Sequence, residues 1–162
     1  MLKPINAAAV LRNGRATGLH PDQIHAGVAW WLGACFVVTL RVANVAVAHD
    51  GHVISSEYAA RFARGAANAQ HYRCHVTVFT APMTQDELVK HARGAGNTPS
   101  GHITTSPSGE VTIALFDAQG TPLTDEAGMA KIRDLIERDR VPIPVNNSSR
   151  GLIEHRGEAG AR

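Results

Sequence analysis

The chain has 162 residues, of which 44% are hydrophobic, and this length and apolar content fit one compact domain. Its formal net charge of +2 comes from 16 basic and 14 acidic residues spread along the chain, so no basic stripe indicates a nucleic-acid or membrane surface. No stretch approaches the roughly 18 apolar residues of a membrane span, and we expect a soluble, cytoplasmic protein. The two cysteines, Cys35 and Cys74, lack zinc-ligand spacing and are expected to be buried thiols.

The first elements are a helix and a strand. Residues 22–38 carry apolar side chains at helical spacing, and Pro21 before them suits the first turn of a helix. Residues 42–48 (VANVAVA) are short, apolar and rich in valine, which predicts a buried strand. Asp50 and Gly51 form the turn that ends it.

The same alternation continues along the chain. Ser55 or Ser56 can cap a second helix, and residues 75–80 (HVTVFT) return to strand character. Thr84 and Glu87 then have the spacing of a capping box, in which each side chain accepts a hydrogen bond from the other residue's backbone N–H. A third, short helix is therefore expected after Thr84.

Two strands at about 101–105 and 111–116 flank a hydroxyl-rich loop that contains Ser106. Only a few residues join them, so they must be antiparallel, because a parallel crossover needs roughly a dozen residues. Thr124 is the expected N-cap of a last helix.

Alternating helices and strands predict a single α/β domain with three layers, α/β/α, over residues 1–140. Its sheet is expected to be mixed and to contain about four strands. Residues 141–162 are rich in Pro, Asn, Ser, Gly and Arg with little periodicity, and we interpret them as a mobile tail or a truncated interdomain linker.

Four stretches of the sequence stand in an order that is typical of one enzyme family: LRNGRATGLHPDQI, VAVAHDGHVISSEYAARFARGAANA, FTAPMT and GHITTSPSG. They resemble, in turn, the N-terminal arginine-glycine segment and first helix start, the strand ending in Gly-x-Asp-x-Arg with its Ser-Ser helix start, the Thr-Pro segment and the active-site serine loop of the alpha-D-phosphohexomutases. This family contains the phosphomannomutases and phosphoglucomutases. The resemblance covers about Leu11 to Arg140 and implies the first domain of such an enzyme.

The resemblance implies roles for particular residues. Ser106 maps onto the serine that is phosphorylated in the working enzyme and that moves a phosphoryl group between C1 and C6 of a hexose phosphate. As a phosphoserine it would also be a ligand of Mg²⁺, the cofactor of the family. Arg12, Arg15, His52 and Thr105 are the candidates for binding phosphate or substrate, with His52 standing where the family usually has arginine.

The sequence departs from the family pattern around the serine. Pro107, Ser108 and Gly109 replace the usual His, Asn and Pro, and no lysine follows nearby. The family's aspartate-rich magnesium loop, sugar-specificity loop and phosphate clamp belong to its other domains. We therefore expect mutase activity only if other domains, for example on a partner polypeptide, complete the site for a hexose phosphate. The alternative is a non-catalytic, degenerate α/β domain that serves as a binding or interaction module.

Structural roles compete with these functional ones. Ser106 can be a turn residue that hydrogen-bonds its own backbone, and Asp50 can cap a turn as well as orient a cationic side chain. His49, Asp50 and His52, with His102 on a neighbouring strand, are also a candidate metal site, although their spacing matches no strong ligand template.

Overall fold

The centre of the molecule is a mixed seven-stranded sheet with the strand order β1-β2-β6-β5-β3-β4-β7. The computed structural model describes residues 5–12, 14–69, 73–141 and 151–157. The strands are β1 (Leu11–Arg12), β2 (Arg15–Leu19), β3 (Asn44–His49), β4 (His75–Phe79), β5 (Ser100–Thr105), β6 (Glu110–Phe116) and β7 (Leu152–Arg156).

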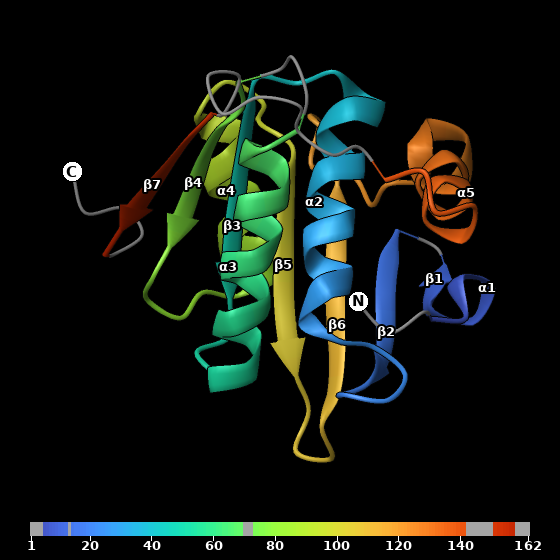
Figure 1. The fold of residues 1–162 in the computed structure, drawn as a ribbon. Helices are drawn as coiled ribbons and strands as arrows, with labels where there is room; N and C mark the ends of the chain where they lie inside the picture. The colour runs from blue at the N-terminus through green and yellow to red at the C-terminus, as the bar shows by residue number, and fades with distance from the viewer. Residues whose placement is uncertain (1–4, 13, 70–72, 142–150, 158–162) are drawn as a thin grey trace.

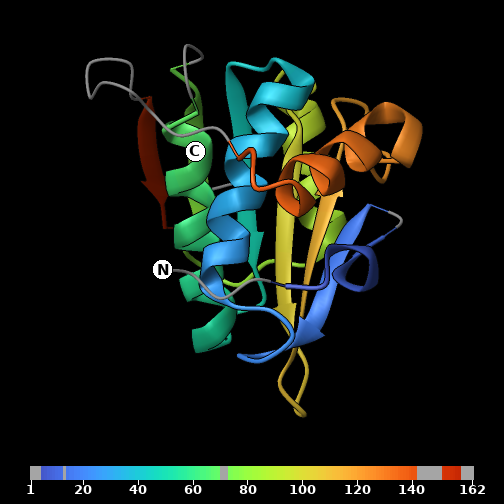
Figure 2. The ribbon, with the colours of Figure 1, turned by 45° about the vertical axis from the view of Figure 1, so that its right-hand side comes forward.

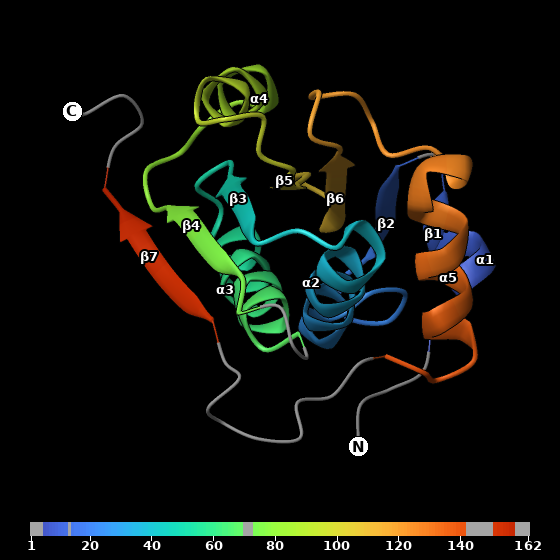
Figure 3. The ribbon, with the colours of Figure 1, turned by 90° about the horizontal axis from the view of Figure 1, so that it is seen from above.

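Helices cover both faces of the sheet (Figure 1), which confirms the predicted three-layer α/β/α arrangement. They are α1 (Ala7–Val10), α2 (Ala26–Leu40), α3 (Val53–Ala67), α4 (Gln85–Gly94), the π-helical turn η1 (Asp125–Met129) and α5 (Ala130–Glu137). The view from above shows α2 and α3 on one face and α4 on the other (Figure 3). Helix α5 packs beside α2 and α1 (Figure 2).

The strands β3, β4 and β5 are parallel to one another, and β5 and β6 form the expected antiparallel hairpin. The sheet is nevertheless larger than the four strands predicted. Strand β2 pairs antiparallel with β6 and extends the sheet on that side, and β1 pairs with β2. The sequence RATGL of β2 has neither a hydrophobic run nor strict alternation, so local pattern gives no sign of a strand.

Strand β7 lies in the segment after Val141, for which the sequence predicts no regular structure. It pairs in parallel with β4, from His75 opposite Leu152 to Phe79 opposite Arg156. Only Leu152 and Ile153 of its five side chains are apolar, so its composition does not predict a strand, and β7 forms through pairing with the edge of β4. The rest of the proposed tail, residues 142–150 and 158–162, lies outside the described residues.

Two predicted helix starts are wrong. Helix α2 begins at Ala26 rather than near Pro21, which lies in the preceding turn. Helix α3 begins at Val53, and its N-cap is His52 rather than Ser55 or Ser56, because the His52 ring accepts the Ile54 N–H. By contrast, α4 has the predicted capping box of Thr84 and Glu87 with both hydrogen bonds formed. Thr124 also caps η1 as expected.

The two faces of the sheet differ in character. The face under α2, α3 and α5 carries the main core, in which Val47, Ile103 and Ile113 are fully buried. The face under α4 has a smaller apolar cluster, consisting of Ala46, Ala48, Phe79, Met83, Leu88 and Ala92. Both free cysteines are buried in the main core as expected, and this burial raises the pKa of each to about 12. Within the described part of the chain, no helix has the length and apolar character needed to cross a bilayer.

Helices α2 and α3 approach closely because each has a glycine at the contact. A Cβ on Gly65 would overlap the carbonyl oxygen of Trp30, and a Cβ on Gly33 would overlap that of Phe62. Backbone atoms cannot move aside as a flexible side chain can, so the two helices must separate to admit even one methyl group.

We therefore expect Gly65→Ala to lower the free energy of unfolding by about 3 kcal/mol, at the upper end of overpacking costs. The matched control is Gly94→Ala at the exposed end of α4, where a new Cβ meets no atom within 4 Å. That change should raise stability by up to about 1 kcal/mol, because alanine favours the helical backbone. Urea unfolding of both variants measures the two effects, and equal effects would contradict the close packing described here.

Candidate functional site

The carboxyl ends of the parallel strands β3, β4 and β5 meet at one edge of the sheet. Asp50 follows β3, Met83 lies in the loop after β4, and Ser106 follows β5. Figure 1 shows the hairpin between β5 and β6 projecting beyond this edge. In open α/β sheets, ligands bind outside the carboxyl ends of the strands, so this edge is the candidate site.

Ser106 opens the hairpin turn. Its N–H donates to the Glu110 carbonyl oxygen at 2.8 Å, and its own carbonyl accepts from the Gly109 N–H at 2.9 Å. Its Oγ accepts the Glu110 N–H at 3.0 Å and lies 2.9 Å from the Ser108 Oγ. Gly109 has φ +90°, a conformation that suits glycine. The Ser106 hydroxyl is thus half-buried at an exposed turn and already serves that turn.

Thr105 is tied to the rest of the edge through Asp50. The Asp50 Oδ2 accepts the Thr105 N–H at 2.9 Å, and Oδ1 accepts the His52 N–H at 3.0 Å. The buried hydroxyls of Ser55 and Thr105 are 2.6 Å apart. Either hydroxyl can donate in this pair, and the Ser55 hydroxyl also contributes to the lowered pKa of Asp50. One carboxylate therefore joins the end of β3, the start of α3 and the last residue of β5.

The charged state of Asp50 is maintained by these bonds. Burial alone would raise its pKa, but the N–H groups of Thr105 and His52, the Ser55 hydroxyl and the nearby His52 ring together hold the pKa below its ordinary value of 3.8. His49, beside it, is buried and accepts the Gly51 N–H at Nδ1. Burial lowers the pKa of His49, with a smaller opposing effect from Asp50 and a smaller supporting one from His102. His49 is therefore neutral at pH 7.

His52 lies at the carboxyl edge of the sheet, as expected, but its observed role there is to cap helix α3. Its Nδ1 accepts the Ile54 N–H at 3.1 Å, and the residue is exposed. A cationic arginine at this position would offer five N–H donors to an anion, whereas the His52 ring uses one nitrogen to accept from the backbone. The position is that of the expected phosphate-binding residue, but its observed hydrogen bond stabilises α3.

Arg12 and Arg15 are not brought to Ser106. They face each other across the β1–β2 pair, and Arg15 lies opposite Ala114, four residues along β6 from Glu110. At about 3.3 Å per residue, Arg15 is roughly 13 Å along the sheet from the hairpin turn. Both arginines line a pocket of about 600 Å³ whose lining extends to Glu110 at the hairpin turn but does not include Ser106, and the Arg12 Nε donates to the Ala8 carbonyl oxygen.

Sequence reasoning misses two residues beside the hairpin. The His20 N–H donates to the Gly109 carbonyl oxygen at 3.0 Å, and the His20 Nδ1 lies 2.7 Å from the Tyr58 hydroxyl. Burial, and to a lesser extent the charge of Glu57, raises the pKa of Tyr58 well above 10, so its phenol keeps its proton. Tyr58 has the spacing of an ordinary core residue, and no local signal in the sequence distinguishes such a residue from one that also hydrogen-bonds a histidine beside the hairpin.

The part of the chain that carries this edge matches a known family. A sequence profile described as phosphoglucomutase/phosphomannomutase, alpha/beta/alpha domain I, matches residues 17–141. The chain belongs to this family. The matched residues include β3 to β6, Asp50 and the Ser106 hairpin, so the predicted family resemblance is confirmed.

Solved structures agree with the fold of this phosphoglucomutase/phosphomannomutase domain. A phosphoglucomutase/phosphomannomutase family protein from Burkholderia thailandensis superposes with a TM-score of 0.74 at 16% identity, covering 94% of this chain and 34% of that one. A phosphomannomutase, titled putative, from Thermus thermophilus gives a TM-score of 0.73 at 19% identity, covering 97% and 34%. The chain thus spans about a third of the length of these proteins. A comparison with curated proteins gave no match.

The magnesium that the family implies does not fit the residues of this domain by themselves. Among the described residues, no group of three or more His, Cys, Asp or Glu side chains is placed to hold a metal ion. His49 and His52 each accept a backbone N–H at Nδ1, so in the neutral rings the hydrogen stays on Nε2 and neither nitrogen has a free lone pair for a metal. The candidate site of His49, Asp50, His52 and His102 is therefore not assembled.

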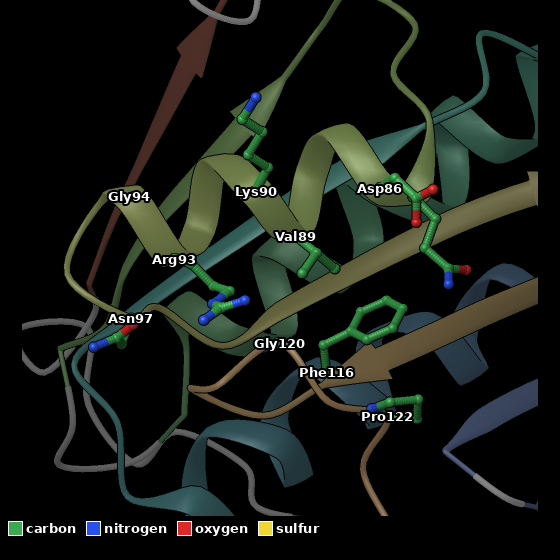
Figure 4. A pocket seen from close by; sticks show the side chains of 10 residues that line it. Asp86, Val89, Lys90, Arg93, Gly94, Asn97, Phe116, Gly120 and Pro122 are labelled. Carbon is green, nitrogen blue, oxygen red and sulfur yellow. The ribbon is translucent and has the colours of Figure 1, made fainter.

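Two pockets adjoin α4. One, of about 430 Å³, lies at the carboxyl edge beside Asp50 and is lined by Asp50, Pro82, Met83, Thr84, Gln85, Glu87, His102 and Thr104. The other, of about 650 Å³, lies between α4 and the end of β6, with Lys90, Arg93 and Phe116 around it (Figure 4). Phe116 is the register partner of Ser100, six residues before Ser106, so this larger pocket is roughly 20 Å from the hairpin turn. Of these two, the smaller pocket lies closer to the serine, because its lining includes Thr104, two residues before Ser106.

We expect Asp50→Asn to lower the free energy of unfolding at pH 7 by about 1 kcal/mol, because solvent access to Asp50 reduces what charged hydrogen bonds contribute. A folded-state pKa below 3.8 means that the carboxylate stabilises the fold fully above that pH and loses this effect as the pH falls through the folded pKa. The difference from the wild type should therefore be constant from pH 7 to about 5 and shrink below about 4. Urea unfolding across this pH range measures it, and a difference that does not change with pH would contradict the assignment.

Proposed function

We propose that this domain supplies the phosphoryl-carrying serine of a hexose-phosphate mutase, with Ser106 as the acceptor and donor of the phosphoryl group. In this proposal the remaining machinery comes from other domains, on the same polypeptide or on a partner. The single observation that supports it most directly is that Ser106 lies at the carboxyl edge of the parallel strands, beside the pocket at Asp50, in a domain of this family.

The hairpin offers suitable surroundings for a phosphoserine. The turn is exposed, so a phosphoryl donor can reach the Ser106 Oγ. The Ser108 hydroxyl and the Glu110 N–H, both within 3.0 Å of that Oγ, are donors for the bridging oxygen of a phosphate ester. Thr105 is fixed by Asp50 through its backbone, which holds the preceding residue in place while the phosphoryl group is exchanged.

The charge of a phosphoserine must be offset from outside this surface. Phosphoryl transfer depends on cations or N–H donors that stabilise charge on the moving oxygens. The pocket beside Asp50 carries two carboxylates, Asp50 and Glu87, and no lysine or arginine. In the proposed enzyme Mg²⁺ would supply that positive charge, held by phosphorylated Ser106 together with ligands from outside the described residues. Activity of the isolated chain is accordingly not expected.

A non-catalytic binding module is the second candidate. The observation that favours it is the use of the Ser106 Oγ as a turn acceptor for the Glu110 N–H, which is a structural role in itself. In that case Ser106→Ala would weaken the hairpin, and the serine would take up no phosphoryl group under any condition.

Phosphorylation of Ser106 separates the two candidates. The full chain is incubated with glucose 1,6-bisphosphate and Mg²⁺, both alone and as a chimera in which it replaces the first domain of the Thermus thermophilus relative. We expect the mass of one phosphoryl group, located to Ser106 by peptide fragmentation, in the chimera. Absence of the label in the chain and in a folded chimera would reject the proposal.

Two variants control this experiment. Ser106→Ala should abolish the label, because no other hydroxyl takes its place at the turn. Ser108→Ala removes only the neighbouring hydroxyl, 2.9 Å away, and should retain it. A label that persists in Ser106→Ala and disappears in Ser108→Ala would show that the proposal names the wrong serine.

A further inference from the structure

The pocket of about 650 Å³ between α4 and the end of β6 has no part in the candidate site at the carboxyl edge. It is built around Phe116, whose register partner Ser100 begins β5, so it lies at the opposite end of that strand from Ser106. Its volume is in the range of sites for small organic ligands. Two cations and one carboxylate are in its lining, whereas the pocket beside Asp50 has two carboxylates and no lysine or arginine. The two pockets therefore suit different ligands.

The wall formed by α4 carries opposite charges at its two ends. Asp86, Val89 and Arg93 are three and four residues apart, so they share one face of the helix. The seven residues from Asp86 to Arg93 correspond to about 10 Å along the helix axis. Figure 4 shows Arg93 and Asn97 at one end of the pocket, Asp86 at the other, and Val89 and Phe116 between them. A complementary ligand has an anionic group at one end and a hydrogen-bond donor at the other.

The middle of the pocket is apolar. Phe116 is only 3% exposed and forms the floor, and Val89 on the α4 side is half-buried. Pro122 pairs with Phe116 in an isolated antiparallel bridge, so it is held beside the floor. A hydroxyl-rich ligand finds no polar partner on these three side chains, whereas an aromatic ring buries apolar surface against them.

The wall opposite α4 is a short loop that is held by its own hydrogen bonds. The Asp117 Oδ1 accepts the Thr121 N–H at 3.0 Å. Gly120 in this loop approaches α4 so closely that a Cβ would lie 2.6 Å from the Val89 Cγ1 and 3.0 Å from the Arg93 Cδ. The loop backbone thus packs against the aliphatic stem of Arg93. This contact restricts the arginine before any ligand binds, which lowers the entropy cost of binding.

The polar groups of the lining are not used within the described part of the chain. No described residue makes a hydrogen bond or an ion pair with the side chains of Gln85, Asp86, Lys90, Arg93 or Asn97. Asp86 and Lys90 have the spacing of a helical ion pair, but in Figure 4 the Lys90 side chain points away from Asp86. The Arg93 guanidinium therefore keeps all its N–H donors for another partner, and their planar fork matches a carboxylate or a phosphate.

We infer that this pocket binds a small aromatic anion. Its carboxylate or phosphate pairs with the Arg93 guanidinium, and its ring packs on Val89, Phe116 and Pro122. A donor at its far end hydrogen-bonds the Asp86 carboxylate, which repels the anionic end and so fixes the orientation of the ligand. The inference is independent of the proposed function, because the pocket is roughly 20 Å from the hairpin turn.

Backbone resonances of the full chain, labelled with ¹⁵N, test this inference. The probes are 4-hydroxycinnamate and AMP, which carry a carboxylate and a phosphate, respectively, on an aromatic body with a donor at the far end. We expect at least one of them to shift the N–H resonances of α4 and of residues 117–121. Inorganic phosphate and glucose 6-phosphate lack an aromatic ring and should bind at least about tenfold more weakly. No shift with either probe, or equal affinity for glucose 6-phosphate, would overturn the inference.

Two variants separate a binding role of Arg93 from the general effect of its charge. Arg93→Gln removes the guanidinium and should weaken binding of the probe about tenfold. Lys131→Gln, on the exposed surface of α5, removes one positive charge elsewhere and should leave binding unchanged. Equal weakening in both variants would reduce the effect to net charge and overturn the inference. Wild-type affinity in a folded Arg93→Gln variant would also overturn it, because Arg93 would then only offset the dipole at the end of α4.

Discussion

The carboxylate of Asp50 ties the end of β3 and the start of α3 to the end of β5, 55 residues away in the sequence. Its two oxygens accept the backbone N–H groups of Thr105 and His52, so the end of β3 is joined to the end of β5 and the start of α3. These segments carry the serine turn and one side of the adjacent pocket. The position of the turn relative to the pocket therefore depends on a charge-assisted interaction rather than on apolar packing.

Apolar packing determines a different property, namely which face of the sheet has space for a pocket. Val47 and Ile103 point into the main core under α2 and α3, and alternation along β5 then sends His102 and Thr104 to the face under α4. On that face alanines flank His102 in register on both neighbouring strands. The larger core thus anchors the sheet, and the small side chains on the opposite face leave the space that the pocket uses.

The elements predicted correctly are those whose signal is local. The capping box of Thr84 and Glu87 lies within four residues, and the β5–β6 hairpin follows from a connection too short for a crossover. Strands β2 and β7 escape prediction because neither RATGL nor LIEHR has a strand-like pattern, and each exists through pairing with a strand distant in sequence. Long-range pairing is a property that hydrophobic periodicity does not report.

The candidate site shows the same division between local and distant information. Sequence motifs associate Arg12 and Arg15 with Ser106, but the register of β2 on β6 places Arg15 opposite Ala114, four residues along the strand from Glu110. Likewise, the sequence makes His102 a candidate metal ligand. In the structure its Nε2–H instead donates to the carbonyl oxygen of Met83, nineteen residues away in the sequence. The lining of the pocket beside Asp50 carries two carboxylates and no lysine or arginine. The cations that a phosphoserine at position 106 would require must therefore come from outside that pocket.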